Sequence, residues 1–318
     1  IYRGAERARE IEPDWIVGLG GGSPMDAAKA IWVFYERPEL EPEDINPFVR
    51  LGLRQKARLI TIPTTSGTGA EVTWAIVLTD PQEQRKMGLG NRENVADIAI
   101  VDPMMAAGMP PSLTADTGLD ALTHAVEGYT CAWRTDLTDG LCVKAARLVF
   151  EYLPRAVENG SDLETRERMH NAATCAGLGF GNAMVSMAHA LGHVLGARFH
   201  VPHGRAVSLF APYTIEFAAA QAPHRFVALA AHLGFARSGD GQGARVLASR
   251  IRGLCRQVGN PTTVAQLGID REAYLAQLEP IVDNAFDDTS MLTACRAPSY
   301  EELRQILRYA YDGQEIDF

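Results

Sequence analysis

The chain has 318 residues, which is enough for one large or two ordinary domains with a buried core. Hydrophobic residues make up 47% and charged residues 22% of the sequence, a composition that excludes a disordered or collagen-like chain. Its 30 basic and 39 acidic side chains give a formal net charge of -9, which disfavours nucleic acid as a partner.

The first hundred residues alternate short apolar runs, glycine-rich turns and helical segments. A charged, helix-like segment around residues 6–10 comes first, with no strand before it. We expect three strands, over residues 15–19, 59–63 and 98–101. A helix is expected over residues 24–32, because a triple-glycine turn and a helix-start proline precede apolar residues at helical spacing. This alternation predicts an α/β amino-terminal domain with a parallel sheet over residues 1–111, and the missing early strand suggests that its start is truncated.

Strand signals disappear after Pro110, and apolar residues then recur at the spacing of a helix. Ser112 is expected to cap the first long helix. Long helices are expected over residues 116–129, 141–158, 163–180 and 183–197, with several more up to Tyr311. The sequence therefore predicts an all-α carboxyl-terminal domain over residues 112–318.

The five cysteines are spread along the chain without a CxxC pair, which argues against a disulfide framework or a thiolate metal site. No apolar run approaches the roughly 18 residues of a membrane span, and no signal peptide is visible. These features predict a cytoplasmic protein with no membrane partner.

Residues 20–26 lie where a strand ends and a helix begins. Glycines there would let backbone N–H groups and the partial positive charge of a helix start approach a phosphate. A tight turn with a helix cap explains the same pattern, which is not the GxGxxG fingerprint. Asp26 would repel phosphate and suits a ribose hydroxyl or an amide better. Lys29, one turn later, is equally compatible with a solvated surface lysine.

Residues 64–71 form a second strand-to-loop junction, which is rich in hydroxyl side chains and small residues. Such a loop can hydrogen-bond a nucleotide, or its side chains can simply cap the next helix. Ligands of open α/β sheets bind at the carboxyl ends of the strands. Two loops of this kind together therefore favour a nucleotide site.

Four of the eight histidines fall between residues 189 and 203. His189 and His193 are four residues apart and so share one face of a helix, and Asp120 and His124 repeat this spacing on another helix. His203 is expected in a turn between a proline and a glycine. One carboxylate and two or three imidazoles brought together would bind a divalent ion such as Fe²⁺ or Zn²⁺ and leave a position for substrate.

Four ordered stretches stand out. They are Gly-Gly-Gly-Ser-Pro-Met-Asp-Ala-Ala-Lys (20–29), Pro-Thr-Thr-Ser-Gly-Thr-Gly-Ala-Glu-Val-Thr (63–73), Gly-Leu-Asp-Ala-Leu-Thr-His-Ala-Val-Glu (118–127), and His-Ala-Leu-Gly-His (189–193) with Pro-His-Gly (202–204). Together they resemble the iron-containing, or group III, alcohol dehydrogenases. Stretches 35–39, 199–204 and 285–288 are similar to the alcohol dehydrogenase module of bifunctional aldehyde-alcohol dehydrogenases.

The resemblance implies an α/β nucleotide domain and a helical domain, with cofactor and metal in the cleft between them. It assigns the ligands of Fe²⁺, or of Zn²⁺ as the alternative, to Asp120, His124, His189 and His203. It places His193 near the nicotinamide and the substrate, as a candidate for proton relay or positioning. It assigns cofactor contacts to Gly21, Gly22, Ser23, Asp26, Lys29, Thr64, Thr65, Thr68, Thr73 and Lys86.

The activity that the resemblance implies is hydride transfer between NAD, or NADP, and a small primary alcohol or aldehyde, by a homodimer or a larger homo-oligomer. The alternatives are a hydroxyacid-oxoacid transhydrogenase and a catalytically impaired, truncated assembly subunit. Family members usually carry several dozen residues before the triple-glycine loop, whereas nineteen precede it here. We therefore expect the sequence to be a fragment of a longer chain.

Overall fold

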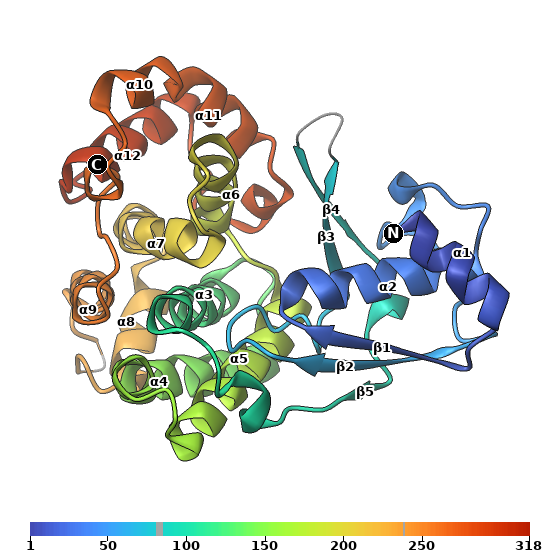
Figure 1. Cartoon of the computed structure of the whole chain (residues 1–318). Helices are drawn as coiled ribbons and strands as arrows, with labels where there is room; N and C mark the ends of the chain where they lie inside the picture. Colours follow the sequence, from blue (N-terminus) through green and yellow to red (C-terminus); the bar gives the residue numbers. More distant parts are fainter. Residues whose placement is uncertain (81–84, 238) are drawn as a thin grey trace.

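The computed structural model describes residues 1–80, 85–237 and 239–318, apart from the side chains of residues 79, 80, 85 and 86. Figure 1 shows a small α/β part, in blue to blue-green, beside a larger helical part that runs from green to red. This arrangement is the predicted fold class. The α/β part contains α1 (Tyr2–Ile11), α2 (Gly22–Glu36), β1 (Trp15–Gly20), β2 (Arg58–Pro63), β3 (Ala75–Asp80), β4 (Arg85–Gly90) and β5 (Ile98–Ala99).

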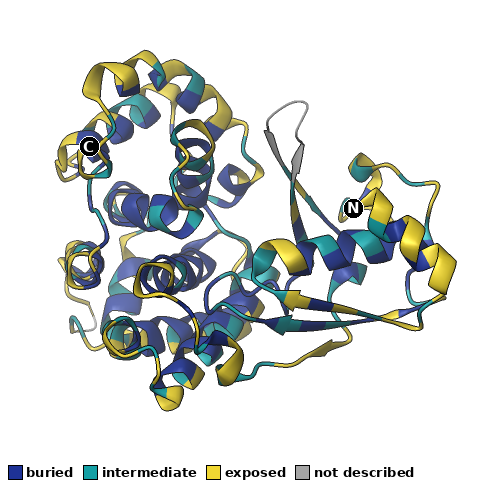
Figure 2. Cartoon of the chain, in the orientation of Figure 1, coloured by how far each residue is buried: buried dark blue, intermediate teal, exposed yellow. Residues whose placement is uncertain are grey.

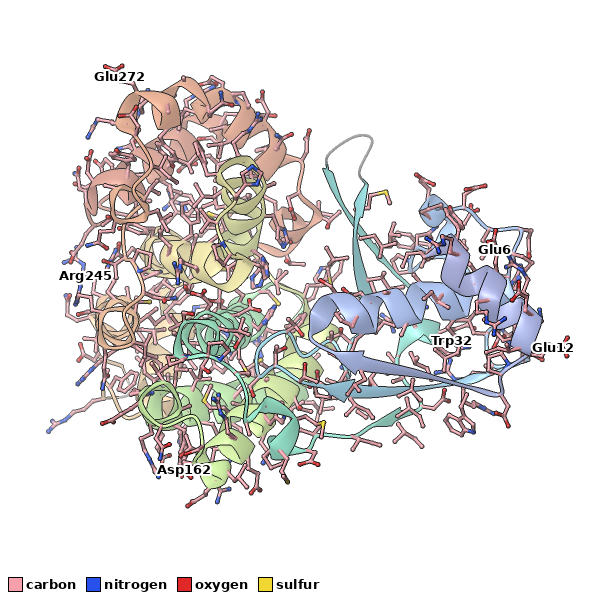
Figure 3. All side chains as sticks on the ribbon, in the orientation of Figure 1. Glu6, Glu12, Trp32, Asp162, Arg245 and Glu272 are labelled. Atoms are coloured by element: carbon pink, nitrogen blue, oxygen red, sulfur yellow. The ribbon has the colours of Figure 1, made fainter. Side chains whose placement is uncertain are left out.

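A parallel sheet in the order β1-β2-β5 forms the base of the α/β part. It consists of the three predicted strands, with β5 two residues shorter than expected. Helix α2 packs on one face of this sheet, and α1 packs on α2. Trp32 of α2, labelled in Figure 3, is fully buried and donates a hydrogen bond to the Ala57 carbonyl at 3.2 Å. Gly20 pairs with Pro63, so β1 and β2 end at the same level and their following loops are neighbours.

Strands β3 and β4 form an antiparallel pair that the sequence analysis did not predict. Ala75 lies opposite Gly90 in this pair, and Ile76 of β3 is fully buried where β3 packs against α2. Only β3 contains β-branched residues, whereas β4 contains basic residues, methionine, leucine and glycine. The sequence signal for the second strand is therefore weak.

The helical part has two apolar cores, which lie among the buried segments coloured dark blue in Figure 2. Its longer helices are α3 (Pro111–Thr130), α4 (Asp136–Glu158), α5 (Leu163–Ala183), α6 (Met187–Phe199), α7 (His203–Ala219), α9 (Gly243–Gln257) and α12 (Tyr300–Asp312). The shorter helices are α8 (Pro223–His232), α10 (Arg271–Ala276) and α11 (Leu278–Phe286). No helix in the described ranges has both the length and the apolar character to cross a membrane.

Helix α3 starts at Pro111, five residues before its predicted start, and its N-cap is Pro110. The prediction that Ser112 caps this helix is wrong, because Ser112 lies inside the first turn. Proline suits the first helical position, since its φ is already helical and it has no N–H group to leave unpaired.

The chain between α5 and α7 also differs from the prediction. Helix α6 starts at Met187, four residues later than expected, because the backbone at Met184 has a φ of 92° and interrupts the helical path. His203 is the first residue of α7 and not part of a turn, since Pro202 acts as the N-cap. His203 is therefore held by a helix, like the other candidate ligands.

The segment after β2, residues 64–74, connects the two parts. The Thr174 hydroxyl of α5 donates to the Glu71 carboxylate at 2.7 Å, and the Trp74 indole donates to the Gly181 carbonyl of α5 at 2.6 Å. These contacts place the loop after β2 directly against the helical part.

Candidate metal centre and nucleotide loops

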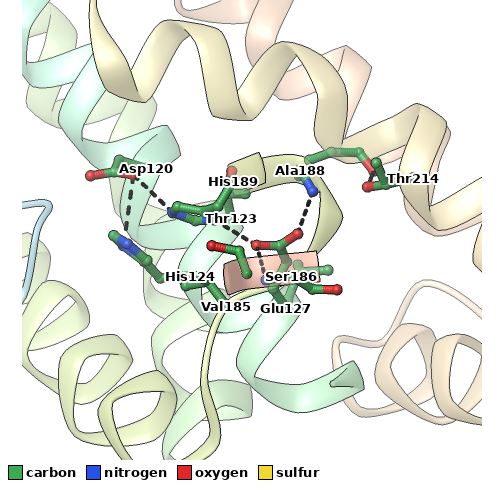
Figure 4. A network of polar contacts seen from close by, with 12 residues as sticks. Asp120, Thr123, His124, Glu127, Val185, Ser186, Ala188, His189 and Thr214 are labelled. Carbon is green, nitrogen blue, oxygen red and sulfur yellow. Dashed lines mark hydrogen bonds and ion pairs between the residues drawn. The ribbon is translucent and has the colours of Figure 1, made fainter. Parts of the chain in front are cut away.

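The four predicted metal ligands come together in the structure. Asp120 and His124 lie one turn apart on α3, His189 lies on α6, and His203 begins α7. One donor atom of each residue lies within 4.8 Å of the donor atoms of the other three. Figure 4 shows Asp120 facing both His124 and His189. Three helices thus converge on one point.

The geometry of this cluster fits a metal ion. The Asp120 Oδ1 atom is 3.7 Å from His124 Nδ1, 3.8 Å from His189 Nε2 and 3.5 Å from His203 Nε2. These Asp120, His124 and His189 atoms are buried and have no hydrogen-bond partner among the described residues. Two ligands that each lie about 2.1 Å from one ion at tetrahedral angles are about 3.4 Å apart. One carboxylate oxygen and three imidazole nitrogens suit a divalent transition metal such as iron or zinc.

The electrostatics of the cluster reflect both its burial and the interactions among its own side chains. Burial acts to raise the pKa of Asp120, but the neighbouring His124, His203 and His189 rings together outweigh it and hold that pKa well below its ordinary range. Burial lowers the pKa of His124 to about 4, so this ring is neutral at neutral pH. An ionised carboxylate and a neutral imidazole are the forms that bind metal.

The cluster is accessible on one side. The His203 side chain is 32% exposed, whereas the other three candidate ligands are at most 6% exposed. The His193 side chain is also 32% exposed, and its ring stacks on that of His203 with 5.3 Å between centroids. The Nδ1 atom of His193 lies 2.8 Å from Asp288 Oδ2. His193 therefore borders the accessible side of the cluster without belonging to the four-donor group.

The loop after β1 leads into the start of α2. This helix begins at Gly22, two residues before the predicted start, with Gly21 as its N-cap. No side chain in the described part of the protein caps this end, and Ser23 is exposed. The first N–H groups of a helix point along its axis and need an acceptor. An uncapped, glycine-lined helix start of this kind can bind an anion.

The loop after β2 lies against the loop after β1. The Thr64 N–H donates to the Gly20 carbonyl at 2.8 Å. A Cβ atom added to Gly22 would lie 3.1 Å from Thr68 Cγ2. The two predicted nucleotide loops therefore lie against each other. The Thr65 Oγ1 atom at this place is buried and has no hydrogen-bond partner within the described ranges.

The loop after β2 also reaches the metal cluster. A Cβ atom added to Gly67 would lie 2.6 Å from Thr117 Cβ on α3, so the loop and the helix are in close contact. The backbone of Gly67 also lies beside the His124 ring and acts to raise the pKa of that ring. Residues 64–68 therefore connect the candidate nucleotide loops to the candidate metal centre.

Asp26 and Lys29 belong to α2 and contact β3. The Asp26 carboxylate accepts a hydrogen bond from the Val77 N–H at 3.0 Å and lies 3.7 Å from Lys29 Nζ. Lys29 is fully buried and donates to the Ala75 carbonyl at 2.9 Å. The alternative of a solvated surface lysine is therefore wrong. Both side chains connect α2 to β3.

The remaining predicted cofactor contacts flank or belong to the β3–β4 pair. Thr73 precedes β3 and is 3% exposed. Lys86 belongs to β4, and its side chain lies outside the described residues. The cofactor roles of these residues, like those of the loop residues, stay predictions.

Comparison with known proteins identifies the family. The model of iron-containing alcohol dehydrogenase matches residues 1–103, and the model of the carboxyl-terminal part of the Fe-containing alcohol dehydrogenase family matches residues 114–311. The chain belongs to the iron-containing alcohol dehydrogenase family. It is accordingly an oxidoreductase, and the resemblance seen in its sequence motifs is confirmed.

Similar proteins cover almost the whole chain. The NADPH-dependent butanol dehydrogenase of Clostridium saccharobutylicum is 38% identical over 100% of this chain and 82% of its own length. The bifunctional aldehyde-alcohol dehydrogenase AdhE of Escherichia coli K12 is 38% identical over 99% of this chain but only 38% of its own length. The solved sulfoacetaldehyde reductase of Bifidobacterium kashiwanohense in complex with NAD+ is 28% identical, with a TM-score of 0.86 over 97% of this chain and 80% of that one.

Two carboxylates beside the cluster had no role in the sequence analysis. Glu127 contacts His189, and Asp288 contacts His193. Each pair joins residues that are far apart in the sequence, so spacing along the chain does not reveal it. The available signal for Glu127 was its position three residues after His124, which puts both side chains on neighbouring positions of α3.

Proposed function

We propose that this iron-type alcohol dehydrogenase transfers hydride between a nicotinamide cofactor and a small primary alcohol or aldehyde, with a bound metal ion. The observation that carries the proposal is the four-donor cluster in contact with the glycine and threonine loops through residues 64–68. The names of the butanol dehydrogenase and of AdhE, which specify alcohol and aldehyde chemistry, support this substrate class.

Asp120, His124, His189 and His203 would hold the ion, with Fe²⁺ as the proposed metal and Zn²⁺ as the alternative. When bound, a divalent ion supplies the Lewis acidity that stabilises negative charge on the substrate oxygen. The donor set carries a single negative charge, from Asp120, so a divalent ion at this site keeps a net positive charge. The accessible side at His203 leaves room for substrate to approach.

His193 would exchange the substrate proton. Its Nδ1–H donates to Asp288, which orients the ring and leaves Nε2 free to accept a proton from an alcohol, directly or through one water. The same atom would return the proton when an aldehyde is reduced. Asp288 thus acts through His193 as a positioning residue.

The two loops would hold the cofactor. Backbone N–H groups of Gly21, Gly22 and Ser23 at the start of α2 suit its pyrophosphate. The hydroxyls of Thr64, Thr65 and Thr68 would bond its polar groups, and the unpartnered Thr65 hydroxyl supports this assignment. Thr73 and Lys86 are proposed as further contacts, and Asp26 and Lys29, which connect α2 to β3, are proposed to lie close to the cofactor. We propose NAD, as in the solved sulfoacetaldehyde reductase, with NADP, named for the butanol dehydrogenase, as the alternative.

The test of this function is removal of single ligands. Asp120→Ala and His203→Ala should abolish both the bound metal and the alcohol-dependent reduction of nicotinamide, with little loss of folded protein. Metal is measured by elemental analysis of purified protein after loading with Fe²⁺ or Zn²⁺, and folding by circular dichroism. His224→Ala is the matched control, because His224 is exposed on α8. Full metal content and activity in either ligand variant would contradict the proposed function.

Three further predictions concern the protein as a whole. We propose a division into domains at residues 1–111 and 112–318, and the family models, which match 1–103 and 114–311, support it. Assembly into a homodimer or larger homo-oligomer and a cytoplasmic location stay predictions from the sequence.

A further inference from the structure

Glu127 is a buried carboxylate on α3, one turn beyond the candidate ligand His124. It is 5% exposed, and its two oxygens accept three hydrogen bonds. The donors are the Ser186 N–H at 2.9 Å, the Ala188 N–H at 2.6 Å and the His189 ring Nδ1 at 2.5 Å. Figure 4 shows this network beside the Asp120 cluster. Both oxygens therefore accept hydrogen bonds, and His189 is the member of the four-donor group that donates to Glu127.

Two of these contacts hold the start of α6. Ser186 is the N-cap of α6, whose own side chain makes no capping bond, and Ala188 is the second residue of the helix. A carboxylate from α3 thus takes the place of the missing cap and lies at the positive end of the helix dipole. The position of His189, the third residue of α6, depends on this attachment of α6 to α3.

The third contact determines which nitrogen of His189 can bind a metal. Because an ionised carboxylate can only accept, the Nδ1 atom of His189 must carry the hydrogen. The other nitrogen, Nε2, is buried, has no partner among the described residues and lies 3.8 Å from Asp120 Oδ1. The contact with Glu127 therefore leaves the Nε2 lone pair directed at the common point of the four donors.

We propose that Glu127 is a positioning residue for the metal centre, which fixes the tautomer and the ring orientation of His189 without touching the ion. The inference rests on the proposed metal function. A carboxylate or carbonyl bonded to the second nitrogen of a ligating histidine raises the basicity of the ligand, and its loss typically weakens metal binding by about 10-fold to 100-fold. A merely structural role, as a cap of α6, would affect folding but would not change the affinity of the folded protein for metal.

The experiment compares Glu127→Gln with the wild-type chain. Glutamine keeps the size of the side chain and one acceptor for the backbone of α6, but it loses the charge that holds the Nδ1 hydrogen of His189. We expect the dissociation constant for Zn²⁺, measured by competition with a chromophoric chelator, to rise about 10-fold to 100-fold. The urea midpoint of the metal-free protein should change much less than in Glu127→Ala, which removes both acceptor oxygens and all three hydrogen bonds.

Glu302→Gln is the matched control. Glu302 also accepts a backbone N–H at a helix start, from Ser299 at 2.7 Å, but it belongs to α12. This variant should lower stability without changing the Zn²⁺ dissociation constant. An unchanged Zn²⁺ affinity in Glu127→Gln, or an equal loss in Glu302→Gln, would overturn the proposal. If the wild-type chain itself bound no divalent ion, the proposed metal function would fail first, so the two failures are distinguishable.

A second measurement applies even if the Glu127 variants do not fold. In the Zn²⁺-loaded wild-type protein, nitrogen NMR of labelled histidines should show His189 bound to metal through Nε2, with a hydrogen on Nδ1 in a strong hydrogen bond. His189→Ala assigns this signal by its loss. Coordination of His189 through Nδ1 would overturn the proposal without any Glu127 variant.

Discussion

Gly204 controls how closely α7 can approach α3 beside the metal centre. It follows the candidate ligand His203, and a Cβ atom at this position would lie 2.1 Å from the Asp116 carbonyl oxygen and 3.1 Å from Asp120 Cβ. Gly204→Ala should therefore push His203 away from Asp120 and destabilise the protein by about 1–3 kcal/mol, the usual cost of overpacking. Zn²⁺ affinity should fall as well. Urea unfolding and chelator competition measure the two effects.

Gly140→Ala is the control for this substitution. Gly140 lies in the exposed part of α4, and no atom lies within 4 Å of a Cβ added there. Alanine in such a helix position is more favourable than glycine by about 0.5–1 kcal/mol. If Gly204→Ala behaved like Gly140→Ala, the close approach of α7 to α3 would not be required for the metal centre.

The residues of the candidate site differ in how visible they are in the sequence. The two pairs at helical spacing, Asp120 with His124 and His189 with His193, already indicated metal chemistry. With His203 these residues number five, and their division into four donors and one neighbour, His193, came from the resemblance to a family, since the spacing alone allows His193 as a ligand. The roles of Glu127 and Asp288 depend on contacts between distant segments, which no spacing rule predicts.

At the scale of secondary structure, the start of α2 and the loop after β2 both contribute to the candidate nucleotide site. Gly22→Val would fill the space in front of the first N–H groups of α2 and would press on Thr68, whose Cγ2 lies 3.1 Å from a Cβ at this position. We expect the dissociation constant for NAD or NADP to rise at least about tenfold, or about 1.4 kcal/mol, while bound metal remains. Nucleotide titration measures the dissociation constant, and elemental analysis measures the bound metal. Unchanged nucleotide binding would contradict the role of this loop.

The elements themselves were predicted more reliably than their ends. The strands of the parallel sheet and the long helices follow from apolar periodicity, which is a property of each segment alone. The start of α6 does not, because the interruption at Met184 and the contacts of Glu127 with Ser186 and Ala188 decide where the helix begins. The β3–β4 pair was missed for a similar reason, since β4 gains its partner from tertiary structure and not from its own composition.

At the scale of the whole molecule, the two parts are joined by the same segment that carries part of the candidate site. Glu71 and Trp74 attach this segment to α5, and Gly67 contacts α3 and His124. The loop after β2 is therefore attached both to the sheet and to the helices that surround the metal centre. The sequence indicated both sites, but their contact depends on packing between the parts.

Asp97 contributes to the stability of the whole molecule in a pH-dependent way. It accepts hydrogen bonds from the Leu59 N–H at 3.0 Å and from Arg54 Nε at 2.9 Å, and so holds β2 to the segment before β5. Burial acts to raise the pKa of Asp97, but these bonds outweigh it and hold the pKa below its ordinary value of 3.8. The unfolded chain therefore takes up the proton more readily than the folded protein. The stabilisation is complete above pH 3.8 and is lost as the pH falls through the folded-state pKa.

The prediction is that Asp97→Asn lowers the urea midpoint near neutral pH and that its difference from wild type shrinks as the pH falls from about 5 to about 3. The measurement uses protein freed of metal with a chelator, so that release of metal in acid does not contribute to the slope. Asp287→Asn, at an exposed carboxylate, is the control for removal of a surface charge. A difference for Asp97→Asn that stayed constant across this range would mean that the side chain acts through its shape and neutral hydrogen bonds, and not through its charge.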